Sequence, residues 1–357
     1  MTPPFRLAFS MNAFNRFAPA AAIETIAAIG YDGVEVMFDE PHLIPAAPDR
    51  AVVESIREAL DRHWMSISNV NAFTMRMLGD TWHPSWIEPD ESQRRQRIDH
   101  TMASLRLAAD LGAPSISTEP GGPLPEGVAR GDAMDTFLAG IAEVAPVAEE
   151  TGVAILVEPE PDLLIETSDQ FRDFIERVDS PAVALNFDVG HFYCVGEDPV
   201  EAFGTLQPWV RHVHLEDIAE TREHRHLAPG DGAVDLAGML QTLADAAYDG
   251  WVTVELYPYQ DDPEAVAARS HEVVRGLLAD LMPPGQAPDL VTVASFATPV
   301  EAGLARIRLD DAGIDTFLAD EHFAPMLGSN VSGGVKLQVR RTDVRRASRL
   351  LGAGPGE

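Results

Sequence analysis

Short apolar runs alternate with longer amphipathic stretches over residues 1–282, and this alternation constrains the fold more than any other feature. Short apolar runs bounded by turn residues predict buried strands, and the amphipathic stretches predict helices. Eight strand–helix units in a segment of this size are typical of a (β/α)₈ barrel, and a doubly wound parallel sheet is the alternative. The expected strands are 6–10, 33–37, 66–70, 115–118, 154–158, 183–187, 210–215 and 251–256, and the expected helices include 49–63, 91–111, 132–151, 167–178 and 235–246.

A Pro- and Gly-rich segment interrupts this pattern after residue 282. We interpret residues 283–289 as a linker, because such composition does not continue a helix or a strand. Residues 290–357 then read as strand, helix, strand, loop, strand and helix. The sequence therefore predicts a barrel over residues 1–282 and a small α+β domain over residues 290–357.

The composition limits the partners of the chain. A formal net charge of −31 disfavours nucleic acid, which proteins bind by neutralising phosphates with Lys and Arg. No uninterrupted apolar run reaches the length of about 18 residues that a membrane helix needs, and the N-terminus lacks the pattern of a signal peptide. We expect a cytoplasmic protein that does not bind membranes. Cys194 is the only cysteine and Lys336 the only lysine, so an internal disulfide and a Schiff-base lysine in the barrel are excluded.

Four metal-ligand residues stand at the ends of the last four predicted barrel strands: Glu158, Asp188, His214 and Glu255. Each could be an ordinary surface residue if considered alone. Alternate residues of a barrel strand point inward, and the carboxyl ends of the strands meet at the catalytic face, so the four side chains are expected to converge. Such a cluster of charge requires a compensating cation, and two Glu, one Asp and one His suit a divalent metal.

The chain resembles the xylose-isomerase-like superfamily of sugar isomerases and epimerases. The resemblance rests on GYDGVEV, VEPEPDLLIET, LNFDVGH, HVHLEDI, RHLAPGDGAVD and VTVELY, which span about residues 5–281 in the family's order. It implies that Glu158, Asp188, His214 and Glu255 hold Mn²⁺, Mg²⁺, Co²⁺ or Zn²⁺. It also implies that His191 binds a substrate hydroxyl or lies beside the ligands, and that Glu35 lines the substrate pocket.

This ligand set predicts enediolate chemistry on a sugar, a cyclitol or a related polyhydroxy carbonyl compound. Glu158 and Glu255 could be ligands and also the acid/base pair that removes and returns a proton. Return to the opposite face would give epimerisation, and return to the adjacent carbon would give isomerisation. A metal-dependent lyase or dehydratase acting on a keto sugar is one alternative, and a non-catalytic metal-binding scaffold whose tail recruits a partner is another.

Endonuclease-IV-like phosphodiesterases are a rival class within the same superfamily. They use additional histidines from strands 3 and 4, where this chain has Asn69, Asn71 and Ser117, so we disfavour this class. His224 and His226 in EHRH leave a second metal open. We favour instead a loop that contacts the substrate through His226.

The segment from Asn71 to Gln93 is long for a loop, which is typical of lids and binding loops. We expect Asn71 to bind substrate and Trp82 and Trp86 to stack on a sugar ring. Packing of the two tryptophans against a neighbouring subunit is the alternative, and a homo-oligomer, either a dimer or a tetramer, is expected. The tail resembles a family of signal-transducing proteins with a PII-like, ferredoxin-like fold, which implies oligomerisation, shielding of the barrel or ligand sensing.

Overall fold

The computed structural model describes residues 5–281, 290–296, 298–310, 312–319, 335–340 and 343–352. The chain divides into two compact units. One is Phe5–Ala279, and the other contains the described residues from 290 onward. The predicted linker at 283–289 lies outside the described residues.

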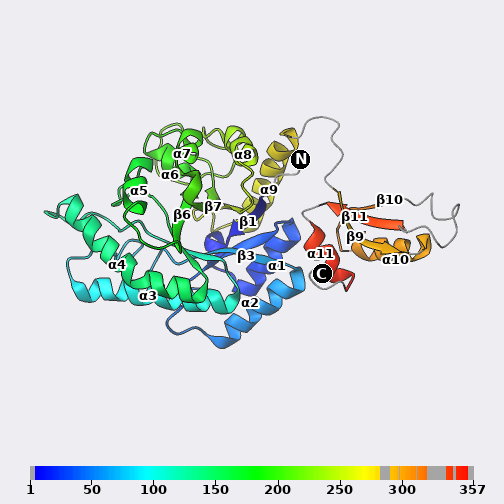
Figure 1. The fold of residues 1–357 in the computed structure, drawn as a ribbon, viewed down its shortest axis with the longest axis horizontal. Helices are drawn as coiled ribbons and strands as arrows, with labels where there is room; N and C mark the ends of the chain where they lie inside the picture. Colours follow the sequence, from blue (N-terminus) through cyan, green and yellow to red (C-terminus); the bar gives the residue numbers. More distant parts are fainter. Residues whose placement is uncertain are drawn as a thin grey trace. The chain divides into compact units, whose positions relative to one another are not determined.

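The first unit is a closed barrel of eight parallel strands in sequence order, in which β8 pairs with β1 (Figure 1). This closure confirms the (β/α)₈ prediction, because a doubly wound sheet would leave two edge strands. The strands expected to end at residues 158 and 256 end at Val157 and Val254. The strands expected to end at residues 70 and 187 extend to Asn71 and Asp188. The strands are β1 (Arg6–Ser10), β2 (Gly33–Met37), β3 (Ser66–Asn71), β4 (Ser115–Thr118), β5 (Ala154–Val157), β6 (Val183–Asp188), β7 (Val210–Leu215) and β8 (Trp251–Val254).

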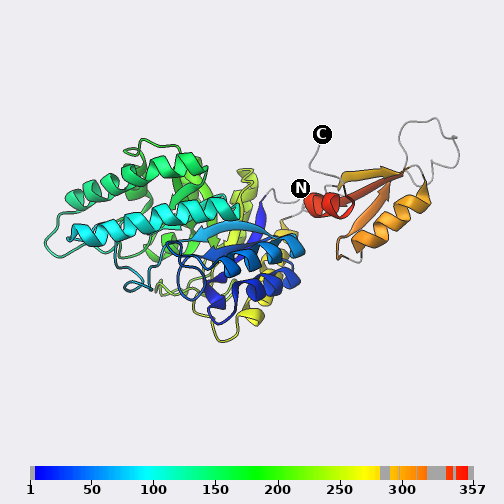
Figure 2. The ribbon, with the colours of Figure 1, turned by 90° about the horizontal axis from the view of Figure 1, so that it is seen from below.

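Helices cover the outside of this barrel, and the long helices α3 and α4 lie side by side (Figures 1 and 2). The sequence sets their ends: the Asp90 carboxylate accepts a hydrogen bond from the Ser92 amide at the start of α3, and Gly112 ends α3 with a φ of 74°. The helices are α1 (Pro19–Ile29), α2 (Arg50–His63), α3 (Glu91–Leu111), α4 (Arg130–Thr151), α5 (Ser168–Ile175), α6 (Val189–Cys194), α7 (Pro199–Leu206), α8 (Leu236–Asp245) and α9 (Pro263–Asp280), with 3₁₀ turns η1 (Met11–Phe14) and η2 (Gln207–Trp209).

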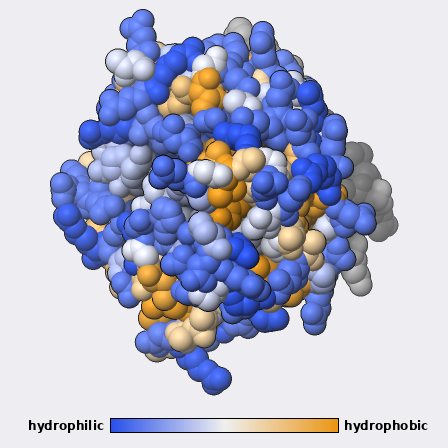
Figure 3. Space-filling model, turned by 90° about the vertical axis from the view of Figure 1, so that its left-hand side faces the viewer, coloured by the Kyte–Doolittle hydropathy of each residue, from blue (hydrophilic) through white to orange (hydrophobic). Residues whose placement is uncertain are grey.

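Apolar side chains fill the layer between strands and helices. Figure 3 shows one face of the molecule, on which hydrophilic side chains dominate and apolar ones form separate patches. In the ranges that the model describes, no helix is both long and apolar enough to cross a membrane.

The second unit contains a three-stranded antiparallel sheet in the order β10-β11-β9. Leu309, Ile314, Leu337, Val339 and Ala347 form its buried core. A ferredoxin-like βαββαβ unit requires a fourth strand, which is not among the described residues, so that assignment stays a prediction. The elements are β9 (Leu290–Phe296), α10 (Pro299–Asp310), β10 (Thr316–Ala319), β11 (Val335–Arg340) and α11 (Val344–Leu350).

Candidate metal centre

The four predicted ligands meet at the carboxyl-terminal end of the barrel. Asp188 is the last residue of β6 and lies beside His214 of β7 in the strand register. Glu158 and Glu255 follow β5 and β8, but their amides donate to Thr118 O at 3.1 Å and to Leu215 O at 3.3 Å. These bonds extend the strand ladders by one residue, so both side chains still face the barrel axis. One potential ligand atom from each of the four lies within 4.8 Å of the others.

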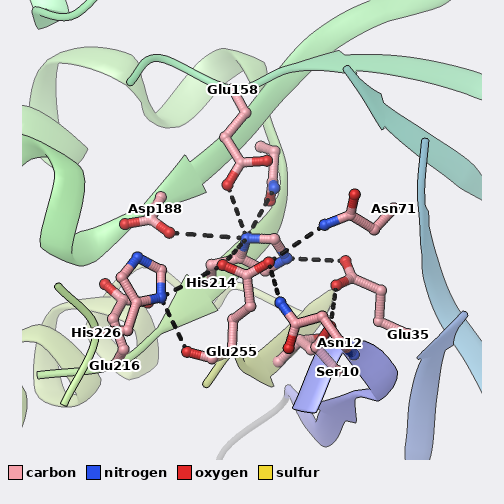
Figure 4. Close-up of polar contacts among 12 residues, drawn as sticks. Ser10, Asn12, Glu35, Asn71, Glu158, Asp188, His214, Glu216, His226 and Glu255 are labelled. Atoms are coloured by element: carbon pink, nitrogen blue, oxygen red, sulfur yellow. Dashed lines mark hydrogen bonds and ion pairs between the residues drawn. The ribbon is translucent and has the colours of Figure 1, made fainter. Parts of the chain in front are cut away.

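The three carboxylates surround one nitrogen of His214 (Figure 4). His214 Nδ1 lies 2.8 Å from Glu158 Oε1, 3.6 Å from Glu255 Oε2 and 3.7 Å from Asp188 Oδ2. All four side chains are buried, and Asp188 Oδ2 has no hydrogen-bond partner in the described part of the chain. An excess of buried negative charge and an unpaired carboxylate oxygen are costly without a cation. Three oxygen donors and one nitrogen donor therefore fit a divalent metal ion.

Glu35 holds the opposite edge of the His214 ring. Its Oε2 atom lies 2.8 Å from His214 Nε2 and accepts a hydrogen bond from Asn69 Nδ2 at 2.9 Å, and its Oε1 atom accepts one from Ser10 at 2.7 Å. Burial opposes ionisation, but the charge and hydrogen bond of His214 lower the pKa of Glu35 to about 2. Glu35 is completely buried and does not line the cavity, which differs from the expected pocket position. It is placed to orient His214.

Two asparagines orient Glu255. Asn12 Nδ2 and Asn71 Nδ2 both donate to Glu255 Oε1, at 2.9 and 3.2 Å. The other oxygen, Oε2, is the one that faces His214. Asn71 therefore contacts a proposed ligand and also lines the cavity. Asn12 likewise contacts Glu255 and lines the cavity.

Two further buried carboxyl groups surround the centre. Glu160 lines the cavity, and burial together with Glu158 and Asp188 raises its pKa well above the usual value. Burial and Asp188 do the same for Glu216. Each lies two residues after a predicted ligand, in VEPEP and HLED, so strand periodicity was the signal that could have found them.

A cavity of about 320 Å³ opens over the centre. Trp82 lies on its wall, with its ring 5.9 Å from that of Phe73. Trp86 does not line it: Trp86 is buried against Phe137, and its Nε1 atom donates to Thr118 at 3.0 Å. We therefore correct the expected stacking role of Trp86, because its ring lies in the core of the barrel unit. The lining includes Asn12, Asn71, Phe73, Arg76, Trp82, Glu158, Glu160, His191, His224, His226, Glu255 and Tyr257.

The loop that carries Trp82 is tied to buried charges at two points. Asp39 accepts hydrogen bonds from the side chain of Thr74 and from the amides of Arg76 and Met77. Arg97 of α3 donates to Phe73 O at 2.7 Å and to Pro84 O at 2.9 Å. The cavity wall is thus fixed by residues of the barrel.

Comparisons with known proteins agree with this architecture. A family model described as "Xylose isomerase-like TIM barrel" matches residues 23–277. The chain is 26% identical to fructoselysine 3-epimerase of Escherichia coli O157:H7 over 268 residues, covering 71% of this chain and 90% of that protein. It is 24% identical to inosose dehydratase of Clostridium beijerinckii (strain ATCC 51743 / NCIMB 8052) over 259 residues, covering 66% of this chain and 80% of that protein. Among solved structures, it is similar to the IOLI protein with a bound zinc atom, with a TM-score of 0.65, 18% identity and coverage of 78% and 99%.

Proposed function

This chain belongs to the xylose isomerase-like TIM barrel family, and from that membership and its site we propose a divalent-metal-dependent isomerase or epimerase. The substrate class is a sugar, a cyclitol or a related polyhydroxy carbonyl compound. One observation carries the proposal: potential ligand atoms of Glu158, Asp188, His214 and Glu255 lie within 4.8 Å of one another, and Glu158 and Glu255 line the cavity. The epimerase among its relatives supports the reaction class.

The donor set suits Mn²⁺, Mg²⁺, Co²⁺ or Zn²⁺. When bound, such an ion supplies a Lewis acid that favours loss of a proton from the carbon beside a carbonyl group. Zinc in the similar IOLI structure supports a divalent ion at a barrel of this kind. Which ion the chain uses stays open.

Glu158 and Glu255 are the proposed acid/base pair. They directly follow β5 and β8, which are not neighbours in the barrel, and so approach the cavity from different sides. In the metal-free site, burial raises the pKa of both carboxyl groups. One carboxylate would remove the proton and the other would return it. Asn12 and Asn71 hold Glu255 Oε1 in place for this task.

The remaining cavity residues would bind the polyol. His191, His226 and Asn71 offer polar atoms to hydroxyl groups, and Trp82 offers a ring face. The cavity volume of about 320 Å³ is at the lower end of small-molecule sites, which run from about 300 to 1,000 Å³. A single small sugar is therefore a better fit than an oligosaccharide.

A dehydratase is the second candidate, and Glu160 favours it. Loss of water requires an acid that protonates the departing hydroxyl group. Glu160 faces the cavity, and its raised pKa keeps a proton available. Inosose dehydratase among the relatives supports this alternative.

The test is proton exchange in D₂O. The protein loaded with Mn²⁺ is incubated with a panel of ketoses, keto sugars and cyclitol ketones, and products are followed by NMR and mass spectrometry. Deuterium next to the carbonyl supports the isomerase or epimerase, and loss of water supports the dehydratase. Glu158→Gln and Glu255→Gln should each nearly abolish exchange, whereas Glu264→Gln on the exposed face of α9 should not change it. Mn²⁺ binding without reaction of any compound would contradict both candidates.

A further inference from the structure

One arginine side chain lies on the wall of the cavity over the candidate metal centre. Arg76 belongs to the loop after β3, and it is the one Arg or Lys among the described residues that line the cavity. The other acidic and basic groups on this wall, apart from histidines, are the carboxyl groups of Glu158, Glu160 and Glu255. A guanidinium in such a cavity marks the point at which a negatively charged group of a ligand can be bound.

Asp39 fixes the backbone at Arg76 without using the guanidinium donors. The buried Asp39 carboxylate accepts two hydrogen bonds at each oxygen, from the amides of Glu40, Arg76 and Met77 and from the side chain of Thr74. Arg76 Nε lies 3.5 Å from Asp39 Oδ2, which is beyond the usual hydrogen-bond range of about 2.7–3.2 Å. No residue in the described ranges accepts a hydrogen bond from the Arg76 side chain. Its five N–H donors are therefore left for a ligand.

The small size of the cavity brings a bound compound close to both the metal centre and Arg76. Its volume of about 320 Å³ lies at the lower end for small-molecule sites. A compound held beside Glu158 and Glu255 therefore also lies against the loop after β3, which contributes Thr81 and Trp82 to the wall. The hydroxyl group of Thr81 adds a second donor type on the same wall as Arg76.

A carboxylate fits this arginine better than a phosphate does. Carboxylate and guanidinium are both planar and can form two parallel hydrogen bonds, and their single charges balance. A phosphate monoester carries close to two negative charges near neutral pH, and the described cavity wall has no second Arg or Lys to balance the other charge.

We propose that the substrate is a keto sugar acid whose carboxylate is bound by Arg76. This inference rests on the proposed function and narrows its substrate class. A neutral sugar would place an alcohol where the guanidinium can bind an anion, so Arg76 would select the acid over the corresponding neutral compound.

Matched pairs of ketoses test the inference. D-Fructose and D-fructuronate differ at one terminal carbon, which is an alcohol in the first and a carboxylate in the second, and D-tagatose and D-tagaturonate form another pair. Exchange in D₂O by the Mn²⁺-loaded protein gives KM and kcat for each compound. We expect the wild type to have a KM about 10- to 100-fold lower for the acid than for the neutral ketose, as for other hydrogen bonds between charged groups.

Variants of Arg76 separate recognition of the acid from a structural role. Arg76→Met keeps the long side chain and removes the charge, so it should remove the preference for the acid. Arg76→Lys keeps the charge without the planar fork and should give an intermediate ratio of the two KM values. A structural role would change both KM values alike and leave their ratio unchanged. Arg106→Met, on the exposed side of α3, is the matched control and should keep the wild-type ratio.

The outcomes distinguish this inference from the proposed function. Equal KM values within each pair, an unchanged ratio in Arg76→Met, or a preference for D-fructose phosphorylated at the same terminal carbon would overturn the inference and leave the proposed function intact. If no compound shows exchange, the proposed function fails, and calorimetry with D-fructuronate decides the inference. Weaker binding to Mn²⁺-loaded Arg76→Met than to the wild type would support it, and equal or absent binding would overturn it.

Discussion

Glu35→Gln tests how the barrel prepares His214 for a metal ion. Glu35 Oε2 accepts hydrogen bonds from His214 Nε2 and Asn69 Nδ2, and Oε1 accepts one from Ser10. The glutamine oxygen can take the place of Oε2 and keep both of its donors. The amide nitrogen can then donate to the Ser10 hydroxyl, which also accepts hydrogen bonds. The substitution therefore keeps the shape of the site and removes one buried negative charge.

The magnitude follows from the role of carboxylates behind metal-binding histidines. Removing such a partner typically weakens metal binding about 10- to 100-fold, which corresponds to about 1.4–2.7 kcal/mol. We expect a loss in this range, because Glu35 Oε2, at 2.8 Å, is the hydrogen-bond partner of His214 Nε2 in the described part of the chain. Isothermal titration with Mn²⁺ measures it directly.

Glu58→Gln, on the exposed side of α2, is the matched control and should bind Mn²⁺ like the wild type. Thermal unfolding without metal shows whether Glu35→Gln folds normally. Equal Mn²⁺ affinity in folded Glu35→Gln and wild type would refute the orienting role of Glu35, whatever the activity.

Three further predictions concern pH, the two tryptophans and the loop. Burial alone would lower the pKa of His214, but Glu35 and the other carboxylates raise it well above the usual value. Metal must therefore displace a proton, so Mn²⁺ affinity should rise with pH by up to about tenfold per unit until His214 is neutral. The metal-free protein should lose stability over the same rise in pH, because the protonated ring stabilises the fold. A Mn²⁺ affinity that calorimetry finds independent of pH would contradict this. Trp86→Ala should destabilise the fold by about 3–5 kcal/mol in urea, whereas Trp82→Ala should mainly raise KM; the reverse pattern would contradict their placement. Asp39→Asn should speed tryptic cleavage after Arg76, because charge-assisted bonds worth about 1.5–3 kcal/mol each are weakened; an unchanged cleavage rate would argue against Asp39 as the anchor.

The sequence predicted the barrel and the convergence of its four acidic and imidazole side chains for the same physical reason. Strands of a parallel barrel end at one face, and residues two apart share a side. His214 and Asp188 follow directly from this rule, since they are neighbours in the register of β6 and β7.

Contacts between distant segments explain what the sequence did not predict. Glu35 lies where the pairing of β2 with β3 shifts register between Val34 and Glu35, so its depth does not follow from periodicity. Trp82 and Trp86 are the same residue type in the same loop, so their local sequence does not distinguish them. The path of the loop places Trp86 in the core and Trp82 on the cavity wall. In the second unit, the local patterns predict strands and helices, but their pairing order depends on contacts far apart in the chain.

The anchoring of the β3–α3 loop by Asp39 and Arg97 has a consequence for how selectivity could change. Residues between the two anchors, such as Thr81 and Trp82, line the cavity but take no part in the barrel ladder. Substitutions between the segments held by Asp39 and Arg97 can therefore change the cavity wall without moving the proposed metal ligands. Barrels that share the same residues at the ends of their strands can in this way acquire different substrate preferences.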